Sequence, residues 1–93
     1  MGYKSHTGAG TITSNLKSDK SLVTVNCDNE KIETGVKKFG AMLGDHVEVG
    51  CNSVLNPGSV IGRNTNIYPL SVARAYVEAN SIYKRLGEIA DKI

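Results

Sequence analysis

A six-residue period in the middle of the chain places the tightest constraint on its fold. From residue 43 to residue 71, an aliphatic residue recurs at every sixth position, and a small or β-branched residue follows each of them four positions later. The aliphatic positions are Leu43, Val49, Leu55, Ile61 and Ile67, and the small positions are Val47, Ser53, Ser59, Thr65 and Ser71. An α-helix does not explain this pattern, because six is not a multiple of 3.6. The period therefore predicts short strands that alternate with corners, with both repeated residues pointing inward.

The corners are supplied by residues that tolerate unusual backbone geometry or close backbone approach. These residues are Gly44, Gly50, Asn52, Asn56, Gly58, Gly62 and Asn64. Hydrogen bonds then run between stacked coils, so each coil needs a neighbour. Each buried aliphatic side chain stabilises such a stack by about 1.5–3 kcal/mol. The chain has no Trp and one Phe, which fits a narrow axis better than a sandwich core.

The same phase returns upstream, in residues 1–6 and 7–12, which we assign with the later hexads to one repeat domain over residues 1–80. Residues 13–42 interrupt it as an irregular insertion. Two apolar stretches, residues 22–25 and 31–34, flank a polar stretch at 27–30 and predict a protruding hairpin. The chain is expected to rejoin the stack near Phe39.

The last residues change period. Ile82, Leu86, Ile89 and Ile93 recur at helical spacing, and Asn80 or Ser81 is suited to an N-cap. We therefore expect a short amphipathic helix over residues 81–93, packed on the stack or simply covering its open end.

Composition excludes several classes of function. The chain has 93 residues, room for one domain, and a formal net charge of +2 with its cations scattered, which gives no basis for nucleic-acid or anionic membrane binding. It has no apolar run of about 18 residues and no apolar signal segment at its start. Its two cysteines, Cys27 and Cys51, form neither a metal-ligand pattern nor a disulfide framework. We expect a cytoplasmic protein with reduced thiols and no bound metal.

Two segments resemble a known family. Residues 8–15 read GAGTITSN, and residues 43–50 read LGDHVEVG. Both resemble the C-terminal acetyltransferase domain of bifunctional N-acetylglucosamine-1-phosphate uridyltransferases, and more closely that of related sugar-phosphate nucleotidyltransferase-like proteins. The likeness covers about residues 6–83.

The resemblance implies an all-β fold, a left-handed parallel β-helix of triangular section with three hexads per coil. It also implies a homotrimer with active sites between subunits, in sugar-nucleotide metabolism. Acetyl-CoA would lie along the coils as co-substrate, with a sugar phosphate or sugar nucleotide across from it. By the same reading, the chain is the C-terminal part of a longer protein whose first domain is the nucleotidyltransferase.

Five positions carry over to binding. Ala9 matches a backbone contact to CoA, and Asn15 matches a polar contact on the sugar side. Cys51 and Pro69 stand where the family has a Ser and an Ala that line the CoA site. Arg74 follows the last regular hexad, and is either a contact to CoA phosphates across a subunit boundary or a solvated charge.

Acyl transfer also needs a base whose pKa lies near the working pH, and histidine suits this best. The family's catalytic histidine lies about one coil before the Gly-Ala-Gly motif, a distance that falls before Met1. Of the two histidines present, His6 precedes the motif and is the candidate, its alternative being a surface or interface residue. His46 stands at an outward repeat position, where Asp45 could orient it only if the two side chains converge, and adjacent strand residues usually diverge.

Three functions remain open. The chain could be an acyltransferase domain that uses acetyl-CoA, a catalytically inert trimerisation module of a nucleotidyltransferase, or a sugar-nucleotide binding domain without catalysis. The Gly-Ala-Gly motif and Asn15 favour the first. The substitutions at Cys51 and Pro69, and the position of the family's histidine, favour the second.

Overall fold

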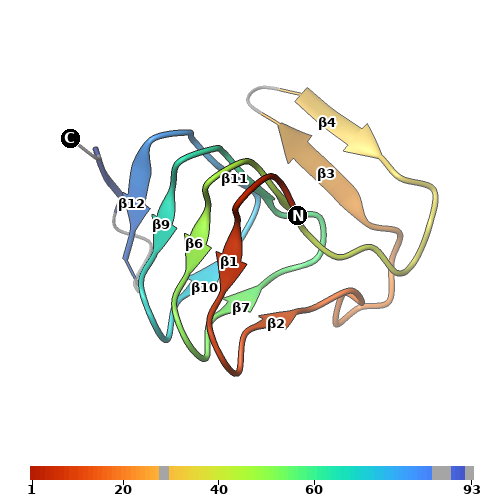
Figure 1. The fold of residues 1–93 in the computed structure, drawn as a ribbon. Helices are drawn as coiled ribbons and strands as arrows, with labels where there is room; N and C mark the ends of the chain where they lie inside the picture. The colour runs from red at the N-terminus through yellow and green to blue at the C-terminus, as the bar shows by residue number, and fades with distance from the viewer. Residues whose placement is uncertain (28–29, 85–88, 92–93) are drawn as a thin grey trace.

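The computed structural model describes residues 1–27, 30–84 and 89–91 and shows an all-β, left-handed parallel β-helix (Figure 1), as predicted. Three parallel sheets form the faces of the stack. The first contains β1 (His6–Thr7), β6 (Glu48–Val49), β9 (Asn66–Ile67) and β12 (Ser81–Tyr83). The second contains β2 (Ile12–Thr13), β7 (Val54–Leu55) and β10 (Val72–Ala73), and the third contains β5 (Met42–Leu43), β8 (Val60–Ile61) and β11 (Tyr76–Val77). Below, these are called the first, second and third faces.

The predicted hexads set the register. Glu48 pairs with Asn66, 18 residues later, so one regular coil contains three hexads. The next coil is shorter, because Val60 pairs with Tyr76, only 16 residues later. The two missing residues lie in the corner between β10 and β11, where Arg74 and Ala75 replace a four-residue connection.

The axis of the stack contains the residues that the period placed there. The buried aliphatic and aromatic positions are Leu43, Val49, Leu55, Ile61, Ile67, Ala73, Val77 and Tyr83. The small positions are buried as well, and their hydroxyls are satisfied by main-chain carbonyls. Ser71 Oγ donates to Tyr68 O at 2.6 Å, and Thr65 Oγ1 donates to Glu78 O at 3.0 Å. Small polar residues therefore fit inside the corners without unsatisfied groups.

The predicted corner residues act in two ways. Asn52, Gly58 and Asn64 have positive φ, at 57°, 76° and 56°. Gly50 instead allows close packing of successive coils, because a Cβ there would lie 2.7 Å from Pro69 Cα.

The insertion contains the predicted hairpin. Strands β3 (Thr24–Cys27) and β4 (Glu30–Glu33) pair antiparallel, from Thr24 opposite Glu33 to Cys27 opposite Glu30. The first strand lies two residues later than predicted. Val23, just before it, is fully buried, and a Cβ on Gly58 would lie 2.5 Å from Thr24 O. The hairpin is thus anchored at the corner before β8 and projects from the side of the stack (Figure 1).

The helix predicted over residues 81–93 is wrong in the part of it that the structure describes. Ser81–Tyr83 is strand β12, which pairs with β9, and Ile89–Asp91 is strand β13, antiparallel to β12. Asn80 has a φ of 59° and forms a corner instead of a helix cap. Leu86 and Ile93 lie outside the described residues.

The reason lies in the edge of β9, whose backbone groups need partners. Tyr68 N donates to Tyr83 O at 2.9 Å, a bond that a helix at this position would not supply. Ser81 and Tyr83 also continue the small and large inward positions. Tyr83 is buried at this end of the axis, and its hydroxyl donates to Val72 O at 2.8 Å. Among the described residues, no helix has the length and apolarity needed to cross a bilayer.

Candidate functional site

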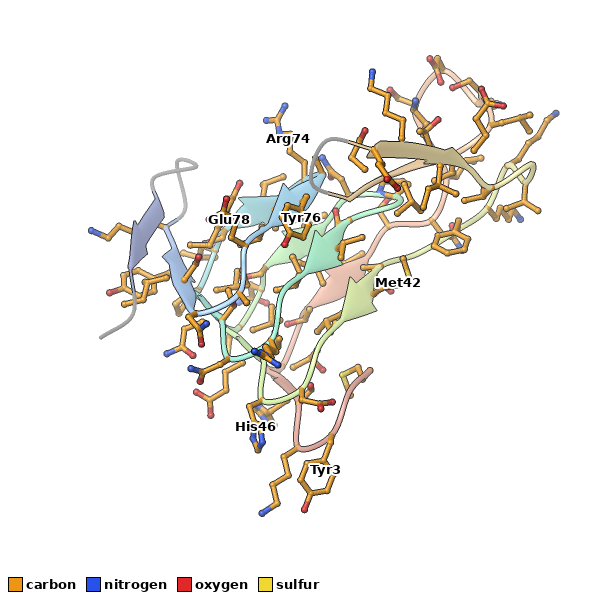
Figure 2. The ribbon with its side chains drawn as sticks, turned by 90° about the horizontal axis from the view of Figure 1, so that it is seen from above. Tyr3, Met42, His46, Arg74, Tyr76 and Glu78 are labelled. Carbon is orange, nitrogen blue, oxygen red and sulfur yellow. The ribbon has the colours of Figure 1, made fainter. Side chains whose placement is uncertain are left out.

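The outward positions of the three faces differ in character. On the first face the ladder of residues in register is His6, Glu48, Asn66 and Ile82. On the second face the ladder is Ile12, Val54 and Val72, and on the third it is Met42, Val60 and Tyr76. Met42 and Tyr76 are labelled on the third face in Figure 2. The groups able to take part in proton transfer thus line the first face, whereas the other two ladders are apolar or aromatic.

Ala9, Cys51 and Pro69 occupy the same corner of three successive coils, between the first and second faces. Main-chain hydrogen bonds fix this stacking: Asn52 N donates to Ala9 O at 2.9 Å, and Leu70 N donates to Cys51 O at 3.0 Å. All three side chains are exposed. The structure therefore brings together three of the positions that resemblance relates to CoA, and we call them the corner column.

A groove of about 360 Å³ runs beside the corner column and is called the first groove. Its lining includes His6, Glu48, Cys51, Asn66, Tyr68 and Pro69. The main-chain N–H of His6 donates to Val47 O at 2.8 Å, while its side chain is exposed. The candidate base thus shares a groove with two of the predicted CoA contacts. A Cβ on Gly8 would lie 2.9 Å from Cys51 Sγ, so the thiol lies close over bare backbone.

Glu48 is the residue of this site that sequence reasoning missed. It lies directly opposite His6 in the parallel pair β1–β6. The two residues are 42 positions apart, and the insertion hides their relation. Extending the hexad phase across the insertion would have been the signal, since both residues immediately precede an inward position.

Arg74 and Asn15 lie away from the first groove. Arg74 lines a second groove of about 460 Å³ at the corner between the second and third faces, which we call the second groove. Figure 2 shows its side chain directed away from the stack. Asn15 is exposed, its carbonyl accepts a hydrogen bond from Phe39 N at 2.9 Å, and its neighbours Ser14 and Leu16 line the second groove.

His46 is not part of either groove. It is exposed at a corner with a φ of 58°, and its ring meets the ring of Tyr3 edge-on, with centroids 5.7 Å apart. Asp45 Oδ1 accepts a hydrogen bond from Tyr3 N at 2.7 Å. Both residues therefore hold the corner of the first coil against the second.

Sequence comparison relates the chain to bifunctional enzymes, although no family model matches it. It is 39% identical over 77 residues to the "Bifunctional sugar-1-phosphate nucleotidylyltransferase/acetyltransferase" of Sulfurisphaera tokodaii, covering 83% of this chain and 19% of the relative. It is 36% identical over 86 residues to the "Bifunctional protein GlmU" of Methanococcus vannielii, covering 91% and 20% respectively. The chain thus spans about a fifth of the length of these relatives.

Solved structures of acyltransferases share the fold. AntD, an N-acyltransferase from Bacillus cereus in complex with dTDP and 3-hydroxybutyryl-CoA, matches with a TM-score of 0.64 at 16% identity, over 94% of this chain and 46% of its own. A maltose O-acetyltransferase from Clostridium difficile 630 matches with a TM-score of 0.55 at 16% identity, over 98% and 60%.

Proposed function

This chain is homologous over most of its length to the C-terminal region of bifunctional sugar-1-phosphate nucleotidylyltransferase/acetyltransferases, and on that basis we propose that it is an acyltransferase domain that uses acetyl-CoA. The observation that supports this most directly is the corner column beside the first groove. The acceptor would be the amine or hydroxyl of a sugar phosphate or sugar nucleotide.

The first groove fits an extended, weakly charged arm such as that of CoA. Gly8 and Gly50, both among its lining residues, leave main-chain groups accessible. Tyr68 and Pro69 supply apolar surface, and their side chains are exposed. Because the same corner recurs in three coils, a ligand running along the stack meets equivalent contacts at each step.

His6 is the proposed general base. Its imidazole takes the proton from the attacking amine or hydroxyl as the new C–N or C–O bond forms at the thioester carbonyl. The C–S bond then breaks, and the CoA thiolate leaves and takes up a proton. Glu48, opposite His6, is placed to accept a hydrogen bond from the imidazole and hold its orientation.

Replacing Ala9 with Trp tests the assignment. We expect calorimetric titration of acetyl-CoA to give one saturable site per subunit, weakened at least about tenfold by Ala9→Trp because the indole fills the corner. Acetyl transfer to an amino-sugar phosphate, followed by mass spectrometry of the product, is expected to fall with it. Val36→Trp, at an exposed position in the insertion, is the control. A folded wild-type chain without acetyl-CoA binding, or an Ala9→Trp variant with unchanged affinity, would contradict the proposal.

A specific observation also favours the second candidate, an inert trimerisation module. Ile12 and Val72, in register through Val54 on the second face, expose 57% and 43% of their surface. Such a contiguous apolar ladder is typical of a surface that meets another protein. We propose that it is the subunit contact of a homotrimer, which serves either candidate and distinguishes neither.

Val72→Lys is expected to lower the mass measured by light scattering from three subunits to one, because it places a charge on the proposed contact. Glu48→Lys introduces the same side chain on the first face and is expected to leave the mass unchanged. Equal masses for wild type and Val72→Lys would exclude this face as the contact.

A further inference from the structure

The second groove gathers positive charge and neutral hydrogen-bond donors without a carboxylate. Its lining residues are Ser14, Leu16, Lys17, Ser18, Asn26, Asn56, Pro57, Arg74 and Ala75. We propose that this groove is a binding site for a phosphate group, such as that of a phosphate monoester or a diphosphate. The site is separate from the first groove, with which it shares no lining residue, and it does not depend on the proposed acyl transfer.

Three separate parts of the fold converge on this groove. Arg74 and Ala75 form the shortened corner between β10 and β11, and Asn56 and Pro57 form the equivalent corner one coil earlier. Lys17 and Ser18 belong to the start of the insertion, and Asn26 belongs to β3. The groove therefore exists because the insertion folds back beside this corner, which explains why hexad periodicity alone gives no sign of it.

The chemistry of the lining favours phosphate over other anions. A guanidinium can donate two parallel hydrogen bonds to phosphate oxygens, and an ammonium adds a point charge. The amide groups of Asn26 and Asn56 and the hydroxyls of Ser14 and Ser18 can donate further bonds. A phosphate monoester carries up to two charges and several acceptor oxygens, which this set of donors matches better than a single carboxylate.

The acid nearest in sequence to Lys17 is Asp19, which is not among the lining residues. Its carboxylate accepts hydrogen bonds from Ser21 Oγ at 2.7 Å and Ser21 N at 3.0 Å. These bonds, with a smaller contribution from the charge of Lys17, lower the pKa of Asp19. Asp19 is therefore ionised near neutral pH and opposes anion binding, so its neutralisation should strengthen the site.

The test is a titration of the full chain with inorganic pyrophosphate, followed by NMR of the backbone amides. We expect saturable shifts at residues 14, 16–18, 26, 56, 74 and 75. The double variant Lys17→Gln/Arg74→Gln is expected to bind at least about tenfold more weakly, in line with the loss of charge-assisted hydrogen bonds. Asp19→Asn is expected to bind about twofold to threefold more tightly. Arg63→Gln, which removes an exposed cation at another corner, is the matched control.

Shifts spread over the whole surface, or equal affinity in wild type and the double variant, would overturn the proposal. Ala9→Trp is expected to bind pyrophosphate as wild type does, so failure at the first groove and failure at the second are separately visible. Titrations with a hexosamine 1-phosphate and with adenosine 3′,5′-bisphosphate then identify the source of the phosphate. Tighter, Arg74-dependent binding of the former supports an acceptor site, and of the latter a site for the nucleotide end of CoA.

Discussion

Val49→Asp is expected to unfold the protein, at a loss of at least about 4 kcal/mol in the free energy of unfolding. Val49 exposes 2% of its surface and lies on the axis among other buried aliphatic residues. A carboxylate there has neither water nor a hydrogen-bond partner. Since single domains are typically stable by about 5–15 kcal/mol, this loss removes most or all of the native population. Circular dichroism during thermal and urea unfolding measures the effect.

Met42→Asp provides the matched control, because Met42 precedes an inward residue as Glu48 does but exposes 44% of its surface. It is expected to change the free energy of unfolding by about 1 kcal/mol or less. If Val49→Asp melts like wild type, the inward register assigned to the hexads is wrong.

Gly50→Ala is the second variant expected to have a large effect, a loss of about 2–4 kcal/mol from overpacking between coils. The added Cβ would lie 2.7 Å from Pro69 Cα and also from Pro69 Cδ. These are atoms of backbone and ring that cannot rotate away. The coils must therefore separate locally, and the corner column separates with them, so acetyl-CoA binding should weaken in parallel.

The control for Gly50→Ala is Gly40→Ala. A Cβ on Gly40 would have its nearest neighbours, Thr13 Cβ and Oγ1, at 3.9 Å, an ordinary contact distance. This variant is expected to match wild type within about 0.5 kcal/mol, measured by urea unfolding. Similar losses for both variants would indicate that close packing of the coils is not the cause.

Sequence alone predicted the stack well where one periodic pattern decides the structure. From Leu43 to Ser71 every inward position was predicted correctly, because side-chain size at the axis and in the corners leaves few alternatives. The hairpin was also predicted, since its strands are local. The C-terminal segment was not, because the spacing of Ile82 and Ile89 fits a helix equally well and the need of the β9 edge for partners is visible only in three dimensions.

The candidate site divides in the same way. Ala9, Cys51 and Pro69 were expected to lie near one another, and the corner column supports that grouping. The second groove could not be predicted, because it joins the insertion to corners more than 30 residues away in sequence, as between Lys17 and Arg74. Contacts of this kind depend on how the insertion folds back, for which the sequence holds no repeating pattern.

The insertion also has a consequence for how such a chain can change over evolutionary time. His6 pairs with Glu48 across 42 residues and Glu48 with Asn66 across 18, yet both pairs stand in the same ladder. The extra segment thus leaves and re-enters the first coil without shifting the register of any later coil. Changes in its length or sequence need not alter the packing of the axis. Ligand preference at the second groove can therefore diversify while the scaffold stays constant, as antibody loops diversify on a conserved sandwich.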